Sequence, residues 1–181
     1  RGAAYVFHGG PAGLAAAPAR SWFGGVAEGR FGASVSGAGD VNADTYADVL
    51  VGAPGQFSGA GAAYLYLGSA SGVPFAADTV VAGLPGAGLG PSVALAGDVN
   101  GDGYDDLLMA RNPSSSVYWW HVFRGTGAGL STTAIATSIP GSDSIVSDVN
   151  GDALADLAQP AASTGLWTLY PRAGLPGDLL A

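Results

Sequence analysis

The sequence predicts an all-β fold built from repeated antiparallel units. Short segments rich in Val, Leu, Tyr and Trp are bounded by Gly, Pro, Ser and Asp, which is typical of strands and turns. Apolar residues nowhere recur at helical spacing over a dozen positions without Gly or Pro, and 31 Gly and 11 Pro would interrupt helices throughout. An Asp-rich motif also recurs three times, beginning at residues 40, 98 and 148. These observations favour a β-repeat protein.

The first complete unit predicts four strands in order, over residues 34–38, 49–53, 63–68 and 79–82. The Asp-rich motif joins the first two strands. Apolar runs at 107–109 and 118–123 repeat the second and third strands, and shorter runs follow at 157–158 and 166–170. Residues 4–9 resemble the third strand, so the chain opens inside a unit. Units of 50 to 58 residues with four short strands are typical of propeller blades.

The repeat predicts four-stranded antiparallel blades, about three blades' worth in all. Residues 1–30 would supply strands three and four of a first blade, 31–88 a second blade, 89–138 a third, and 139–181 a partial last blade. Such a stack is an incomplete ring with two open edges, and open edges invite pairing with another chain. We therefore expect either a fragment of a longer protein or a homo-oligomer that closes the ring.

Each Asp-rich motif reads Asp-x-Asn-x-Asp with a further Asp four residues later. Side-chain oxygens at positions one, three, five and nine of the loop, with the main-chain carbonyl at position seven, can surround one cation. The predicted ligands are Asp40, Asn42, Asp44, Tyr46 and Asp48 in the first loop, Asp98, Asn100, Asp102, Tyr104 and Asp106 in the second, and Asp148, Asn150, Asp152, Leu154 and Asp156 in the third. Oxygen ligands at this spacing fit Ca²⁺, up to three ions at one per loop.

Other interpretations of the loops remain open at this point. They could be plain Asp/Asn turns held by side-chain to backbone hydrogen bonds. Magnesium is a further alternative, although it tolerates a crowded, carbonyl-rich site poorly. An EF-hand is disfavoured because the flanking segments are strands and no Glu stands at position twelve. Position six requires a sharp turn that Gly accepts freely, and only the second loop has Gly there, so we expect the second site to bind most tightly and the first less so.

Charge and composition exclude several classes of partner. The net charge is −8, with six Arg and no Lys, which argues against binding of nucleic acid. Each loop supplies three Asp ligands, so nine of the fourteen acidic residues belong to the predicted sites. Three Ca²⁺ ions would bring the net charge to −2. Cysteine is absent, which excludes thiolate sites, and no run approaches the ~18 apolar residues of a membrane span, so we expect no membrane insertion.

The segments around the first loop resemble a known family. Phe31-Gly32, Gly39-Asp40, the loop itself and Gly52-Ala53-Pro54 are similar to the FG-GAP repeat of the propeller at the head of integrin α-subunits, which also occurs in many bacterial surface and secreted proteins. The second copy keeps Leu89-Gly90 and ends in Arg111-Asn112-Pro113, one residue longer. The third retains little beyond its loop. We expect a bacterial member of this family or a fragment of one.

The resemblance implies a non-catalytic function outside the cell or at its surface. The expected role is a secreted, calcium-stabilised scaffold that recognises a protein or glycan or mediates adhesion. The competing class is an accessory or catalytic domain of a secreted hydrolase, and a third is a structural spacer. Acids outside the ligand sets, such as Glu28, Asp78 and Asp105, form no arguable pair for glycosidase chemistry. Trp22 could belong to an exposed aromatic platform, although core packing is the more frequent fate of such residues.

Overall fold

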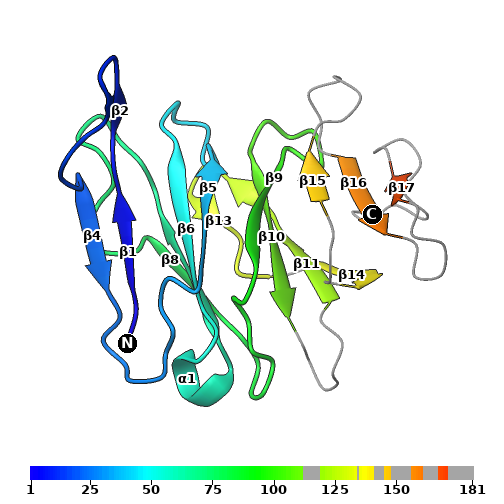
Figure 1. Ribbon diagram of the computed structural model, residues 1–181. Helices are drawn as coiled ribbons and strands as arrows, with labels where there is room; N and C mark the ends of the chain where they lie inside the picture. Colours follow the sequence, from blue (N-terminus) through cyan, green and yellow to red (C-terminus); the bar gives the residue numbers. More distant parts are fainter. Residues whose placement is uncertain (112–118, 134, 141–144, 148–155, 161–166, 171–181) are drawn as a thin grey trace.

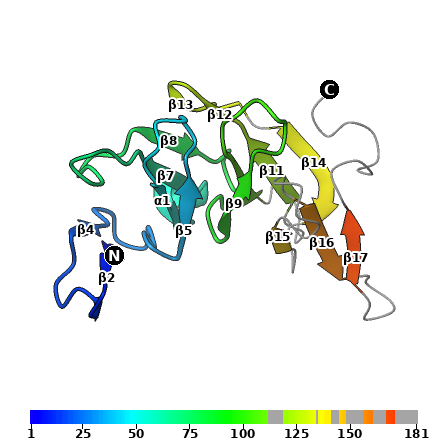
Figure 2. The same cartoon turned by 90° about the horizontal axis from the view of Figure 1, so that it is seen from above.

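The computed structural model describes six parts of the chain, and its described strands pair antiparallel (Figures 1 and 2). The described residues are 1–111, 119–133, 135–140, 145–147, 156–160 and 167–170, with side chains described for 1–109 and 121–133. In this part of the chain the sheets stand side by side in chain order, from the N-terminal strands to the C-terminal strands (Figure 2). This arrangement confirms the predicted all-β fold of antiparallel blades.

Each sheet is built from strands that are close in sequence. A two-stranded sheet pairs β1 (Ala3–Val6) with β4 (Arg20–Phe23). The first four-stranded sheet contains β5 (Ser34–Gly39), β6 (Asp48–Ala53), β7 (Ala62–Tyr66) and β8 (Thr79–Ala82), in that order. The second contains β9 (Val93–Gly97), β10 (Asp106–Arg111), β11 (Trp119–Phe123) and β14 (Ile135–Pro140). A three-stranded sheet of β15 (Ile145–Ser147), β16 (Asp156–Pro160) and β17 (Trp167–Tyr170) follows.

The strands predicted for the first complete unit are confirmed to within two residues at each end. The predicted fourth strand, 79–82, has the bounds of β8, and the predicted second strand begins one residue inside β6. Two short hairpins were not predicted: β2 (Gly9–Gly10) with β3 (Gly13–Leu14), and β12 (Gly125–Thr126) with β13 (Gly129–Leu130). A single turn, α1 (Gln56–Gly59), is the only helix among the described residues. The division into blades by residue range stays a prediction.

The first four-stranded sheet is buried on both faces. Successive residues of a strand point to opposite faces, so Leu50 and Val51 of β6 enter different cores. Leu50 packs in a cluster that includes residues of the second four-stranded sheet, such as Leu107 and Phe123. Val51 packs in a second cluster with Trp22 of β4. Apolar contact on both faces stacks this sheet between its two neighbours, as in a propeller.

Trp22 lies on β4 and belongs to the core. Its side chain is only 5% exposed, its ring centroid lies 4.3 Å from that of Tyr66, and its Nε1 donates a hydrogen bond to the carbonyl of Pro74 at 3.1 Å. The expectation of core packing is therefore confirmed, and the alternative of an exposed platform is wrong for this residue.

The two described Asp-rich loops connect β5 to β6 and β9 to β10. Both lie at the end of the sheets opposite α1 (Figure 1). The structure thus places the two loops on one edge of adjacent sheets. No helix within the described residues is long and apolar enough to cross a membrane.

Candidate metal-binding loops

The structure describes two of the three predicted loops. Residues 40–48 form the first and residues 98–106 the second. The predicted ligands Asp148, Asn150, Asp152 and Leu154 of the third loop lie outside the described residues, and Asp156 is described only as the first residue of β16.

The carboxylate at position one organises each loop by accepting hydrogen bonds from the backbone. Asp40 accepts from the N–H groups of Asp44, at 2.9 Å, and Thr45, at 2.7 Å. Asp98 accepts from the same positions of the second loop, Asp102 at 3.1 Å and Gly103 at 2.8 Å. The chain therefore curls around this first carboxylate in both copies.

Positions three and five add a second layer of contacts that also repeats. The side-chain oxygen of Asn42 accepts from the N–H of Asp44 at 3.3 Å, and Asn100 accepts from Asp102 at 2.8 Å. The carboxylate at position five then accepts from the N–H at position seven, at 2.9 Å in the first loop and 3.1 Å in the second. These are the side-chain to backbone bonds expected of Asp/Asn turns. They bring three oxygen-bearing side chains of each loop into one turn.

Position nine anchors each loop to the body of its sheet. Asp48 is 1% exposed, and its two carboxylate oxygens accept from the N–H groups of Val41, at 2.9 Å, and Gly68, at 2.7 Å. Asp106 is fully buried and accepts in the same way from Val99, at 3.1 Å, and Gly125, at 2.9 Å. One side chain thus joins the start of the loop to the end of the third strand.

Burial gives these position-nine carboxylates unusual protonation properties. Burial raises the pKa of Asp106 to about 6, although the hydrogen bonds from Gly125 and Val99 lower it and the nearby charges of Asp102 and Asp98 raise it further. Burial likewise raises the pKa of Asp48 above its usual value. Removal of a carboxylate from water disfavours its charged form, and a nearby cation would favour that form.

The backbone of each loop turns through left-handed conformations at two positions. At position six, φ is 76° for Thr45 and 90° for Gly103, which confirms the sharp turn predicted there. Position four is also left-handed, with φ of 56° for Ala43 and 79° for Gly101, a feature that was not predicted. Glycine adopts this region freely, whereas other residues are strained in it. The second loop therefore forms with less backbone strain than the first.

The side chains present fit a hard divalent cation by their chemistry. The turn of each described loop offers only oxygen donors, which suit Ca²⁺ or Mg²⁺ rather than a softer metal. Among the described residues no three His, Cys, Asp or Glu side chains gather closely enough to form a metal cluster by themselves. In the first loop the side-chain amide of Asn42 donates to the carboxylate of Asp44 at 3.0 Å, while Asp48 accepts from backbone N–H groups at the base.

Sequence reasoning missed a contact between the two loops. Asp105, at position eight of the second loop, accepts a hydrogen bond from the backbone N–H of Asp40 at 2.8 Å, and its own N–H donates to the carbonyl of Asp40 at 3.2 Å. Thr126 also donates from its N–H to the carbonyl of Val41 at 3.0 Å. The second loop and the β12–β13 hairpin therefore hold the start of the first loop. The one sign of this contact in the sequence is that position eight is Asp in the second loop and Ala in the other two.

Comparison with known proteins places these loops in a family. The model of the FG-GAP-like repeat matches residues 40–109 and 98–158. Integrin alpha-PS5 of Drosophila melanogaster is 35% identical over 101 residues, which cover 52% of this chain and 10% of that protein. Integrin alpha-IIb of Mus musculus is 37% identical over 92 residues, covering 49% and 9%. Integrin alpha-X of Mus musculus is 51% identical over 41 residues, covering 23% and 4%.

The matches extend well beyond the loops, although the chain spans about a tenth of the length of the first two integrin relatives. The two overlapping family matches together cover residues 40–158, which include all three Asp-rich loops and the strands between them. The resemblance inferred from the first loop and its flanking Phe-Gly and Gly-Ala-Pro segments is thereby confirmed, and the chain belongs to the FG-GAP-like repeat family.

Proposed function

We propose that this chain is a calcium-stabilised, non-catalytic recognition module that acts outside the cell or at its surface. The observation that carries the proposal is the repetition of one oxygen-lined hydrogen-bond network in both described loops. The similarity of the chain to integrin α chains supports a role in recognising a protein or glycan or in adhesion. The Ca²⁺ concentration outside cells suits sites of modest affinity, with Kd values of about 0.1–1 mM.

The residues that would hold each ion are those at positions one, three, five and nine, with the carbonyl at position seven. In the first loop these are Asp40, Asn42, Asp44, Asp48 and the Tyr46 carbonyl, and the second and third loops supply the equivalent sets. A bound ion supplies positive charge to closely spaced carboxylates that otherwise repel one another. Because the unfolded chain has no such site, binding of the ion stabilises the folded state directly.

The described residues support a role for these loops other than catalysis. Of the two histidines, His8 is exposed just after β1 and His121 is buried on β11, so neither belongs to a loop. Each loop is a hairpin connection that ties two strands together, and its position-nine carboxylate contacts the backbone on both oxygens. These contacts support a structural function for the ion.

A candidate surface for a macromolecular partner lies at the end opposite the loops, near α1. A hollow of about 430 Å³ is lined there by residues that include Glu28, Arg30 and Ser58. All three are left-handed, with φ of 61°, 53° and 55°. Strained backbone of this kind concentrates at functional sites because surrounding structure must hold it in place. We propose this end as the recognition surface.

Calcium titration with a chelator control tests the proposal. Each occupied site adds about 1.4–2.7 kcal/mol to the free energy of unfolding when free Ca²⁺ is ten- to a hundredfold above its Kd. That corresponds to a rise in Tm of roughly 3–10 °C per site for a chain of this size. Isothermal titration should show saturable binding that is reduced in Asp40→Ala and Asp98→Ala and preserved in Asp78→Ala. An unchanged Tm between millimolar Ca²⁺ and excess chelator would refute the calcium role.

A further inference from the structure

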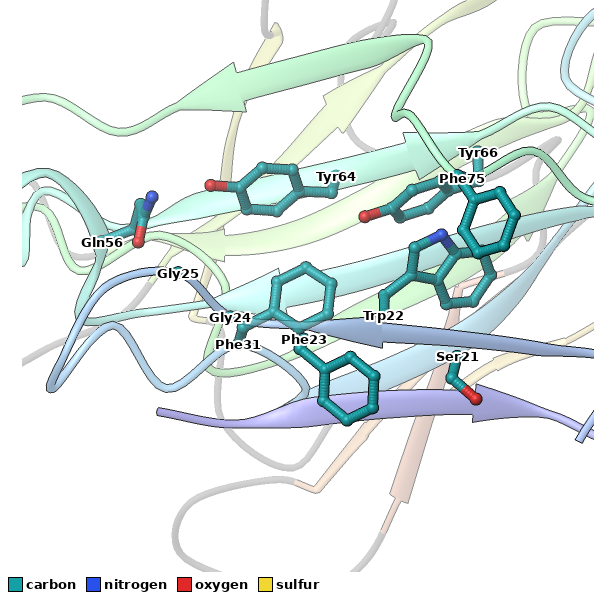
Figure 3. A pocket seen from close by; sticks show the side chains of 10 residues that line it. All are labelled: Ser21, Trp22, Phe23, Gly24, Gly25, Phe31, Gln56, Tyr64, Tyr66 and Phe75. Atoms are coloured by element: carbon teal, nitrogen blue, oxygen red, sulfur yellow. The ribbon is translucent and has the colours of Figure 1, made fainter.

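A second hollow lies between β4 and β7, on the side of the first four-stranded sheet that faces the N-terminal strands. Its volume is about 340 Å³, within the ~300–1,000 Å³ range of small-molecule sites. Figure 3 shows Tyr64 and Tyr66 of β7 on one side, with Trp22 of β4 and Phe31 on the other. None of its lining residues belongs to either described Asp-rich loop.

The polar group at the centre of this hollow is the hydroxyl of Tyr66. Tyr66 is only 4% exposed, and its hydroxyl points into the space between the surrounding rings (Figure 3). Its neighbours are satisfied, since Tyr64 has a side-chain hydrogen bond with Gln56 and the indole N–H of Trp22 bonds to the carbonyl of Pro74. Because this hydroxyl faces the hollow, a ligand there can replace its hydrogen bond to water with one of its own.

The walls of the hollow carry aromatic rings and no charge. None of the lining residues is acidic or basic. The Arg20 guanidinium is not part of the lining and lies over the ring of Phe75, 3.9 Å from its centroid. Phe75 is 74% exposed at the mouth of the hollow. A charged ligand would therefore find no opposite charge inside.

We propose that this hollow is a binding site for a neutral sugar ring. A sugar presents apolar C–H faces, which pack on aromatic rings, and hydroxyl groups at its edges, which can both donate to and accept from the Tyr66 hydroxyl. A purely apolar ligand would leave that hydroxyl unpaired. Phe31 and Tyr64 supply ring surface deeper in the hollow, and Phe75 supplies it at the mouth.

The site is independent of the proposed calcium role, because its residues lie outside the loops. It also goes beyond the proposed recognition surface, which lies around Glu28, Arg30 and Ser58. Failure of one proposal is therefore distinguishable from failure of the other. A sugar that binds here would be detected equally in a chain whose loops bind no metal, provided that chain remains folded.

The test measures binding of the methyl glycosides of glucose, galactose, mannose and N-acetylglucosamine by saturation-transfer NMR and calorimetry. We expect at least one glycoside to bind with a Kd of about 10 mM or tighter, the range of a single small subsite. Tyr66→Phe keeps the ring and removes the hydroxyl, so it should weaken binding about three- to tenfold. The Tm of this variant should change little, because the hydroxyl faces the hollow and the packed ring is kept.

Two exposed phenylalanines provide a matched pair of variants. Phe75→Ala should weaken binding severalfold, while Phe57→Ala, which removes a 53% exposed ring outside the hollow, should leave it unchanged. Absence of binding by all four glycosides in the folded wild-type chain would overturn the proposal. It would equally be overturned by binding that survives Tyr66→Phe and Phe75→Ala without change. A proline-rich or aromatic peptide that binds in place of the glycosides would assign the hollow to a protein partner instead.

Discussion

Single residues explain why the first loop carries more backbone strain than the second, although both loops share one hydrogen-bond network. The second loop has Gly at both left-handed positions, Gly101 and Gly103, whereas the first has Ala43 and Thr45 there. Position six could be predicted from the sequence because a sharp turn favours Gly. Position four could not, since its left-handed conformation follows from how the chain wraps the carboxylate at position one.

Replacement of Ala43 and Thr45 in the first loop by glycine should stabilise the protein. Each left-handed non-Gly residue costs about 1–2 kcal/mol, partly offset by the ~0.5–1 kcal/mol of additional entropy that Gly gives the unfolded chain. We expect Ala43→Gly with Thr45→Gly to raise the free energy of unfolding by about 1–2 kcal/mol, measured by urea unfolding, and to tighten Ca²⁺ binding at that loop. Ala47→Gly is the control, and it should destabilise instead, because Ala47 has no left-handed strain to relieve. Equal effects of both changes would contradict the strain argument.

The buried phenol of Tyr66 predicts a loss of stability at alkaline pH. Burial first, and the neighbouring Tyr64 second, raise its pKa to about 12. The folded state therefore keeps the proton to higher pH than the unfolded state, whose tyrosine titrates near 10. Its contribution is fully present below pH 10 and is lost as the pH rises from about 10 to 12. Urea unfolding across this range should show a shallower decline for Tyr66→Phe than for the wild type, and parallel declines would exclude Tyr66 as the cause.

At the scale of strands and turns, the repeat period and the turn residues were sufficient to predict the main sheets. The strands β5 to β8 could be predicted because each is a short apolar run between Gly, Pro or Asp. The two-residue hairpins β2–β3 and β12–β13 were not, because two residues are too few for a periodic pattern. The left-handed turn in α1 places Phe57 and Ser58 in a conformation that neither residue type favours.

Gly125, which begins β12, shows how closely these elements approach one another. Its N–H donates to Asp106, and an added Cβ would lie 2.7 Å from the carbonyl oxygen of Val41 in the first loop. Gly125→Ala should therefore lower the free energy of unfolding by roughly 1–3 kcal/mol through overpacking. Gly9→Ala is the matched control, because nothing lies within 4 Å of a Cβ there. Thermal and urea unfolding that gave the same result for both variants would disprove the close contact.

For the molecule as a whole, contacts between sheets decide whether the repeats act together. Such contacts join residues far apart in sequence, and Asp105 is 65 residues from its partner Asp40. The sequence could therefore exclude Asp105 from the ligand set, but it could not identify Asp40 as its hydrogen-bond partner. Asp105 in the second loop and Gly125 and Thr126 in β12 contact the start of the first loop, so the shape of one predicted calcium site depends on the neighbouring repeat.

Asp105→Ala should weaken that dependence. Loss of the acceptor leaves the N–H of Asp40 without this bond, which costs about 1–3 kcal/mol of stability. Since Asp40 is position one of the first loop, we also expect weaker Ca²⁺ binding there, with little change at the second loop, whose position-one carboxylate is Asp98. Asp78→Ala serves as the control, because Asp78 accepts a hydrogen bond from the N–H of Leu67 within a single sheet.

A double-mutant cycle of Asp40→Ala with Asp98→Ala, repeated in the Asp105→Ala background, measures the coupling between the two loops. If the two loops communicate through Asp105, the interaction energy in Ca²⁺ should fall toward zero when Asp105 is removed, and an undiminished energy would assign the communication to the apolar contacts between the sheets.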